Sequence, residues 1–203
     1  MTKQGSLRTA GWGKLLAALA MALLALVATP AAAGAADMAD TASGPRTDFS
    51  AQVRSAGLTG TEARSLQARV DGYLAKMPGT QVGANKIALA GGIGELVLTL
   101  PGERYARDLT APNAELGAAA GCPYTYVCAY PYEDFVGEEL RLFTCNYPVR
   151  IYWGGTGSWI NNQRSTLYAR FYDLNGNLGW TSPGGYSEDR HAPWGWVGWL
   201  SPC

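Results

Sequence analysis

The sequence has little of what most catalytic and nucleic-acid-binding proteins use. Its 203 residues include one histidine and four lysines, and 16 acidic residues balance 16 basic ones, so there is no basic excess for a nucleic-acid partner. Gly-x-Ser-x-Gly elbows and Gly-Lys-Ser/Thr phosphate loops are both missing. Because no catalytic constellation is apparent, we expect the protein not to be an enzyme.

The two features nearest to catalytic ones have simpler interpretations. His191 is the sole imidazole and lies in Asp-Arg-His-Ala-Pro, which predicts a surface loop. The acidic pairs Glu133-Asp134 and Glu138-Glu139 flank one predicted turn. Adjacent acids on a turn indicate a solvated rim rather than the carboxylate pair of a hydrolase.

Long hydrophobic runs are also lacking. The longest, from Leu15 to Ala28, has 14 residues, whereas crossing a membrane takes about 20. Three cations precede this run and small residues follow it, which is the pattern of a secretory signal peptide; a retained membrane anchor is the disfavoured alternative. We therefore predict that residues 1–36 are a signal peptide, and that the mature protein is secreted, extracellular and without a membrane partner. Its 167 residues would carry a net charge of −3.

The four cysteines, Cys122, Cys128, Cys145 and Cys203, would meet an oxidising environment after export, which predicts two disulfides. Four cysteines allow three pairings that sequence does not distinguish. Our working prediction is Cys122 with Cys128 and Cys145 with Cys203. Zinc ligation is the alternative, but the spacing of the first two cysteines and the single histidine disfavour it.

Composition divides the rest of the chain into two parts. Of the 22 aromatic residues, 18 follow Gly121, whereas all four lysines precede it. The Pro- and Ala-rich stretch 110–121 predicts an exposed linker, where proteolysis would be natural. Residues 37–109 would then be a small α+β leader or pro-segment, and residues 122–203 the functional domain.

The leader is expected to hold one helix and one β-hairpin. Thr59 and Glu62 have capping-box spacing, and apolar residues then recur at helical spacing, which predicts a helix over 60–77. Two short strands, 86–90 and 95–100, flank a Gly-rich turn and predict a hairpin.

The functional domain is expected to be all-β. Short aromatic or β-branched runs are divided by Gly, Pro, Asn and Asp, which is typical of a small antiparallel sandwich. The predicted strands are 126–130, 139–143, 150–153, 166–172, 178–181 and 195–200.

One motif in this domain carries a family resemblance. Tyr130, Phe135 and Gly137 have the spacing of a folded hairpin in which two rings stack and the glycine permits a close backbone approach. With Asn161-Asn162-x-x-Ser165, this motif resembles a βγ-crystallin Greek-key motif. The opening Cys-Pro-Tyr-Thr-Tyr-Val-Cys resembles secreted bacterial peptidase inhibitors of the metalloproteinase-inhibitor type. The resemblance covers about residues 122–203 and implies a βγ-crystallin-like Greek-key sandwich.

The resemblance also implies a candidate calcium site. Calcium takes oxygen ligands that include backbone carbonyls. The ligands would be Ser165, the Gln163 carbonyl and oxygens near Asp173, with Asn161 and Asn162 shaping the loop. A second amide loop is missing, so at most one ion is expected, and no cofactor is required. The alternative is a turn whose side chains bond to their own backbone.

Peptidase inhibition is the leading functional hypothesis, with an extracellular peptidase as partner. A rigid, disulfide-braced surface loop loses little ordering entropy on binding. The candidate inhibitory loop consists of Cys145, Asn146, Tyr147, Pro148, Val149 and Arg150. The glycine-rich stretch 153–160 is a second candidate that is expected to be too flexible.

The alternative hypothesis is a calcium- or glycan-binding module, such as a toxin-like protein acting at the cell wall. Trp194 and Trp196 alternate and would share one strand face. With Trp153, Trp159, Trp180 and Trp199 they would form a platform whose rings stack on a cell-wall glycan. Core packing explains most such rings.

Overall fold

The computed structural model of the protein describes residues 48–111 and 121–203. The predicted signal peptide and most of the predicted linker lie outside these residues. In the part of the chain that is described, no helix is long and apolar enough to span a membrane.

Two helices begin the described chain: α1 (Ser50–Ser55) and α2 (Gly60–Leu74). The predicted capping box at the start of α2 is confirmed, because the Thr59 N–H donates to Glu62 Oε2 at 2.8 Å and the Glu62 N–H donates to Thr59 Oγ1 at 3.3 Å. The helix ends three residues before its predicted end and buries Leu66 and Val70.

The predicted hairpin is also confirmed. Strand β2 (Lys86–Leu89) pairs antiparallel with β3 (Gly94–Val97) across a turn in which Gly91 and Gly92 have positive φ. A strand that was not predicted, β1 (Gly79–Gly83), pairs with β2 on its other side.

The remaining strands make the rest of the described chain mostly antiparallel β, as expected. They are β4 (Tyr126–Tyr130), β5 (Glu139–Leu142), β6 (Val149–Arg150), β7 (Thr156–Asn162), β8 (Tyr168–Tyr172), β9 (Leu178–Gly184), β10 (Ser187–Pro193) and β11 (Trp199–Ser201).

Three predictions for this part were wrong. Strand β7 occupies most of the stretch 153–160, which was expected to be a flexible loop. Strand β10 runs through His191, which was assigned to a loop. Residues 194–196 form a short 3₁₀ turn instead of the start of a strand, because Trp194 is drawn into the core.

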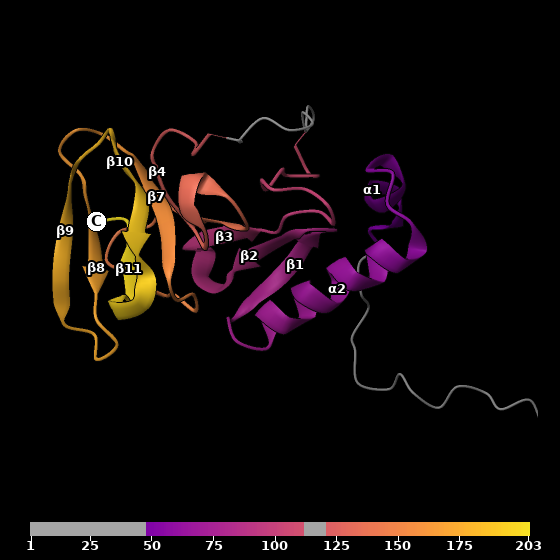
Figure 1. The fold of residues 1–203 in the computed structure, drawn as a ribbon, viewed down its shortest axis with the longest axis horizontal. Coiled ribbons are helices and arrows are strands. Elements are labelled where there is room, and N and C mark those ends of the chain that lie inside the picture. The colour runs from indigo at the N-terminus through magenta and orange to yellow at the C-terminus, as the bar shows by residue number, and fades with distance from the viewer. Residues whose placement is uncertain (1–47, 112–120) are drawn as a thin grey trace, which may run out of the picture. The chain divides into compact units, whose positions relative to one another are not determined.

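The strands form two sheets, and the larger one crosses the predicted domain boundary (Figure 1). Its seven strands have the order β1-β2-β3-β5-β4-β7-β10, and the second sheet has the order β6-β11-β8-β9. Strand β3 pairs with β5 from Gly94–Leu142 to Val97–Glu139. The described residues before and after the predicted linker therefore do not form separate units, contrary to our expectation of a detached leader.

The hydrophobic core is shared in the same way. Leu66 and Val70 of α2 belong to one buried cluster with Leu140 of β5 and Phe171 of β8. Two hydrogen bonds join the end of α2 to the loop after β6: the Tyr152 hydroxyl donates to the Lys76 carbonyl and the Trp153 indole donates to the Tyr73 hydroxyl. Helix α2 is thus an integral part of the fold.

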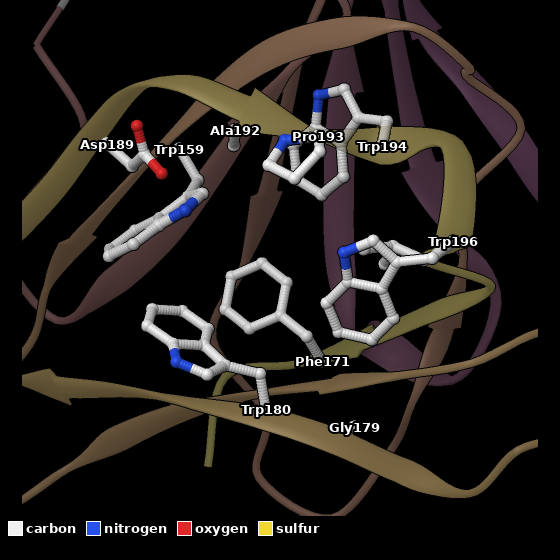
Figure 2. Close-up of a pocket in the computed structure, with 10 residues that line it drawn as sticks. Trp159, Phe171, Gly179, Trp180, Asp189, Ala192, Pro193, Trp194 and Trp196 are labelled. Carbon is white, nitrogen blue, oxygen red and sulfur yellow. The ribbon is translucent and has the colours of Figure 1, made fainter.

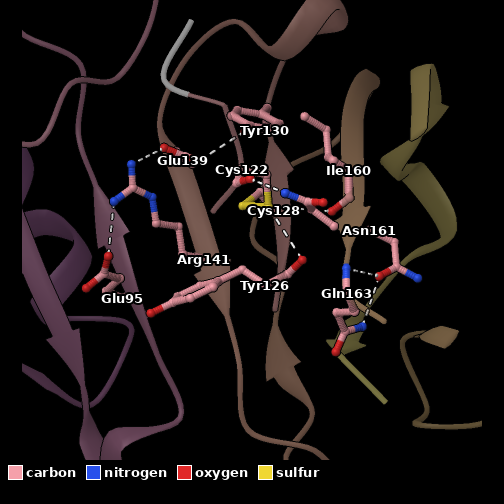
Figure 3. The surroundings of a disulfide bond; sticks show 11 residues. Glu95, Cys122, Tyr126, Cys128, Tyr130, Glu139, Arg141, Ile160, Asn161 and Gln163 are labelled. Carbon is pink, nitrogen blue, oxygen red and sulfur yellow. Dashed lines mark hydrogen bonds and ion pairs between the residues drawn. A yellow bond between two sulfur atoms is a disulfide. The ribbon is translucent and has the colours of Figure 1, made fainter. Parts of the chain in front are cut away.

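A buried ion network lies across the β3–β5 pairing (Figure 3). Arg141 contacts Glu139 at 2.7 Å and Glu95 at 3.1 Å, and the Tyr130 hydroxyl donates to Glu139 at 3.0 Å. Glu139 is fully buried, so the interpretation of this acid as part of a solvated rim was wrong. Burial raises the pKa of the Glu139 carboxyl, and the Arg141 guanidinium opposes that rise.

Both predicted disulfides are confirmed. Cys122 is bonded to Cys128, and Cys145 to Cys203, which closes a span of 58 positions. Among the described residues there is no free cysteine. Two disulfides are consistent with an oxidising environment.

We predict that Arg141→Met destabilises the fold by about 3–5 kcal/mol at pH 8, because it leaves Glu139 buried without its cation. This loss of stability should become smaller as the pH is lowered towards 5. A carboxyl with a raised folded-state pKa is better tolerated when protonated, so the variant regains stability as the pH falls.

Urea unfolding at the two pH values measures both effects. Arg190→Gln is the control, because Arg190 is half-exposed in its ion pairs with Asp134 and Glu188 and should cost at most about 1 kcal/mol. Equal losses for the two variants would contradict the role given to Arg141.

Candidate functional site

An aromatic pocket of about 360 Å³ lies between the two sheets (Figure 2). Its rings come from four elements: Trp159 from β7, Phe171 from β8, Trp180 from β9, and Trp194 and Trp196 from the 3₁₀ turn. The volume falls within the range of small-molecule sites in proteins.

The wall of the pocket is a packed cluster of three rings. Phe171 and Trp180 are cross-strand partners in the β8–β9 pairing, with ring centroids 5.2 Å apart. Trp159 lies 5.6 Å from each of them at tilts of 54–58°. Such tilted contacts favour a rigid arrangement. Trp159 and Phe171 are buried, whereas Trp180 is 42% exposed, so the cluster is open to solvent at Trp180.

Trp196 closes the opposite side of the pocket. Its ring lies directly over Gly179 of β9, where a Cβ atom would collide with it. Trp196 is 37% exposed, so it forms a wall that a ligand can reach.

Trp194 has a different position from the one predicted. Its side chain is 1% exposed, and its indole N–H donates to the Tyr130 carbonyl at 2.7 Å. Gly157 of β7 leaves room for this indole. Trp194 and Trp196 therefore do not share an exposed strand face, and only Trp196 of this pair is available to a ligand.

One carboxylate faces the same pocket. Asp189 of β10 is the register partner of Trp159 in β7, which places both side chains on one face of the sheet. Its Oδ1 accepts the His191 N–H at 2.8 Å. The neighbouring Arg190 is directed elsewhere, to Asp134 and Glu188.

The predicted inhibitory loop has an exposed tip held at both ends. Asn146, Tyr147 and Pro148 are exposed, and the tyrosine shows 58% of its surface. On one side, Cys145 is bonded to Cys203, whose carbonyl accepts the Asn146 N–H at 3.0 Å. On the other, Val149 and Arg150 form β6.

Strand β6 pairs in turn with β11, where Val149 faces Leu200 and Arg150 faces Trp199. The Arg150 guanidinium lies over the Trp199 ring, 5.2 Å from its centroid. Asn146 has φ +63°, a left-handed conformation that asparagine tolerates better than most residues. The conformation of the loop is therefore fixed by Asn146 itself, by the disulfide at one end and by the β6–β11 pairing at the other.

The predicted calcium ligands are not brought together. Gln163 and Ser165 precede β8, whereas Asp173 follows it, so the two groups lie at opposite ends of one strand. The Gln163 and Ser165 carbonyls lie against Gly185 and Gly184.

The side chains of Asn161, Asn162, Gln163 and Asp173 already have protein partners. Asn161 is buried, donates to Leu167 and Ser182, and accepts from Gln163, while Asn162 donates to the Cys122 carbonyl. The Asn177 side-chain amide and nearby backbone N–H groups lower the pKa of Asp173. In residues 48–111 and 121–203, no cluster of three or more His, Cys, Asp or Glu could hold a metal ion. Calcium binding stays a prediction from the motif alone.

The hairpin motif brings its two rings and its glycine together, as its spacing predicted, but the rings are tilted by 59° and do not stack. The Tyr130 and Phe135 rings lie 5.4 Å apart, and Gly137 has φ +101°, with Pro131 and Tyr132 occupying the space that a Cβ atom would need. The Phe135 N–H donates to Ser158 Oγ, and this hydroxyl donates to the Tyr132 carbonyl. The turn is thus attached to β7, next to the pocket.

Comparison of the chain with known protein families, with curated proteins and with solved structures finds no match. The site's interpretation rests on its residues.

Sequence reasoning missed two pocket residues, Phe171 and Asp189. Phe171 was placed on a strand, but nothing indicated which sheet its ring would face. Asp189 was assigned to a loop because β10 is polar and carries Pro193 at its end. The alternation of polar and apolar residues in β10 was too weak to indicate a strand.

We predict that Gly157→Ala destabilises the protein by about 2–3 kcal/mol, because the new Cβ would overlap the Trp194 indole and the Tyr130 carbonyl. Gly154→Ala is the matched control: nothing lies within 4 Å of its Cβ position, and its effect should stay within about 1 kcal/mol. Urea unfolding followed by tryptophan fluorescence measures the stability of both variants. Similar unfolding midpoints would contradict the close packing of Trp194 against Gly157.

Proposed function

We propose that the protein is a secreted peptidase inhibitor that acts through the loop 145–150. The observation that supports this most is the exposed Tyr147, held between a disulfide and a paired strand. A peptidase cleft binds a segment that projects from the surface and keeps its shape. The proposal gives Tyr147 the role of the side chain that enters the enzyme's pocket.

Preorganisation is the physical basis of this function. A flexible segment loses conformational freedom when a peptidase binds it, at a cost of about 0.5–1.5 kcal/mol for each immobilised rotamer-rich side chain. Here Asn146 is already hydrogen-bonded to Cys203, and Pro148 has a fixed φ. A rigid loop that resists the distortion of cleavage behaves as an inhibitor instead of a substrate.

The family resemblance supports the same proposal. The residues that carry the resemblance are the hairpin of Tyr130, Phe135 and Gly137, whose two rings lie 5.4 Å apart, and the opening segment closed by the Cys122–Cys128 disulfide. We include in the proposal a βγ-crystallin-like Greek-key arrangement for residues 122–203. Secretion is part of it as well, since two disulfides suit an extracellular protein.

The whole disulfide-bonded protein is the correct test material, because β5 of the proposed inhibitor domain pairs with β3 of the preceding part. We expect it to inhibit a thermolysin-like metallopeptidase or a serine peptidase at micromolar concentration or below.

Tyr147→Ala should weaken inhibition at least about tenfold, as expected for a large central contact residue. Tyr124→Ala is the control, since Tyr124 is equally exposed but lies outside the loop. Inhibition constants measured against both enzyme classes test the proposal. No inhibition by the unaltered protein, or equal losses in the two variants, would refute it.

The disulfide at the base of the loop gives a second prediction. Replacing Cys145 and Cys203 by serine should lower stability by about 4 kcal/mol, because the bond closes 58 positions, against about 2 kcal/mol for Cys122 and Cys128, which close 6. The first pair of substitutions should also weaken inhibition, and the second should not. Urea unfolding and inhibition assays, made under conditions where both variants are folded, separate the two effects.

A further inference from the structure

The charge in the aromatic pocket is unbalanced. Of the described residues that line it, Asp189 is the only charged one, and the others able to form side-chain hydrogen bonds are indoles. Among the described residues Asp189 has no ion-pair partner. Arg190, the nearest cation in sequence, lies over the Phe135 ring and is paired with Asp134 and Glu188. The pocket therefore combines a carboxylate with the electron-rich faces of several rings.

Both parts of this lining attract a cation. An ammonium group over the face of a tryptophan is stabilised by the ring's quadrupole, and the attraction grows when the site is partly dry. Figure 2 shows the Phe171 ring in the middle of this lining, with Trp159 and Trp180 on one side of it, Trp196 on the other, and Asp189 beside Trp159. The methyl groups of an alkylated ammonium would contact the rings while its charge is balanced by the carboxylate.

A neutral sugar ring fits this lining less well. It would stack on Trp180 or Trp196, but most of its hydroxyl groups would face apolar atoms of Ala192, Pro193 and Val197. Hydroxyls that lose water without a new partner cost free energy. The Trp194 indole N–H cannot serve them, because it is already bonded to Tyr130.

We propose that the pocket formed by Trp159, Phe171, Trp180, Asp189 and Trp196 is a binding site for a small alkylammonium group, such as a choline headgroup or a methylated lysine side chain. The site is separate from the loop 145–150 and does not depend on the proposed inhibition.

Calorimetric titration of the disulfide-bonded protein tests the proposal with four ligands. Choline and Nε-trimethyllysine represent the two sources of the cation. The uncharged isostere 3,3-dimethylbutanol has the shape of choline without its charge, and N-acetylglucosamine represents a glycan. Saturable binding of at least one of the two cations, with no measurable binding of the other two compounds, is the expected result. Equal binding of choline and its isostere, preference for the sugar, or no saturable binding at all would each overturn the proposal.

Variants locate the site. Asp189→Asn keeps the oxygen that accepts the His191 N–H and removes only the charge, so affinity should fall about tenfold while the unfolding midpoint stays close to that of the parent protein. Glu188→Gln, a neighbouring carboxylate already engaged by Arg190 and Tyr186, is its control and should leave affinity unchanged.

Trp196→Leu should also lower the affinity, because it keeps an apolar side chain but removes the ring face. Trp199→Leu is its control, since that tryptophan lies under Arg150 outside the pocket. Cation binding that survives both Asp189→Asn and Trp196→Leu would place the ligand elsewhere and refute the assignment. Inhibition should be unchanged in both variants, so this proposal and the proposed inhibition can fail separately.

Discussion

The antiparallel pairing of β3 with β5, crossed by the Arg141 ion network, is the constraint on which the rest of the structure depends. It joins a hairpin near the start of the described chain to the strands that carry the aromatic motif. Arg141 of β5 faces Glu95 of β3 directly in this pairing. A slip by one residue would separate this ion pair and turn the side chains of one strand to the opposite face of the sheet. Strands β4, β7 and β10 are then added in order beyond β5. The position of Trp159 and Asp189 thus follows from a contact several strands away.

The shape of the pocket depends on two glycines. Gly157 permits Trp194 to reach the Tyr130 carbonyl, and Gly179 permits Trp196 to lie on β9. These two glycines set how deeply each indole enters. The buried indole closes the floor, and the exposed one forms a wall. The candidate loop 145–150 is instead held by added constraints. A disulfide and a paired strand flank its three exposed residues, one of which is a proline.

Local signals in the sequence predicted local structure well. The capping box at Thr59, the β2–β3 hairpin and the Tyr130–Phe135 ring pair each depend on residues within a few positions of one another. Long-range pairings were harder. The composition of the linker suggested two separate units, yet Leu96 and Leu140 are partners in adjacent strands of one sheet. Trp194 and Trp196 looked like alternating strand residues, since no local pattern shows that a carbonyl 64 positions earlier will bond one of them. Asp189 could be assigned to the pocket only once β10 had a register.

The shared sheet also changes what cleavage of this chain can do. If a peptidase cut the backbone between residues 111 and 121, the two products would still be joined by the β3–β5 ladder, the Arg141–Glu95 ion pair and the hydrogen bond from Tyr152 to Lys76. They would migrate as two bands in denaturing gels and as one particle under native conditions. The protein would then behave as a naturally split polypeptide, in which neither fragment is a processing by-product and each completes the fold of the other.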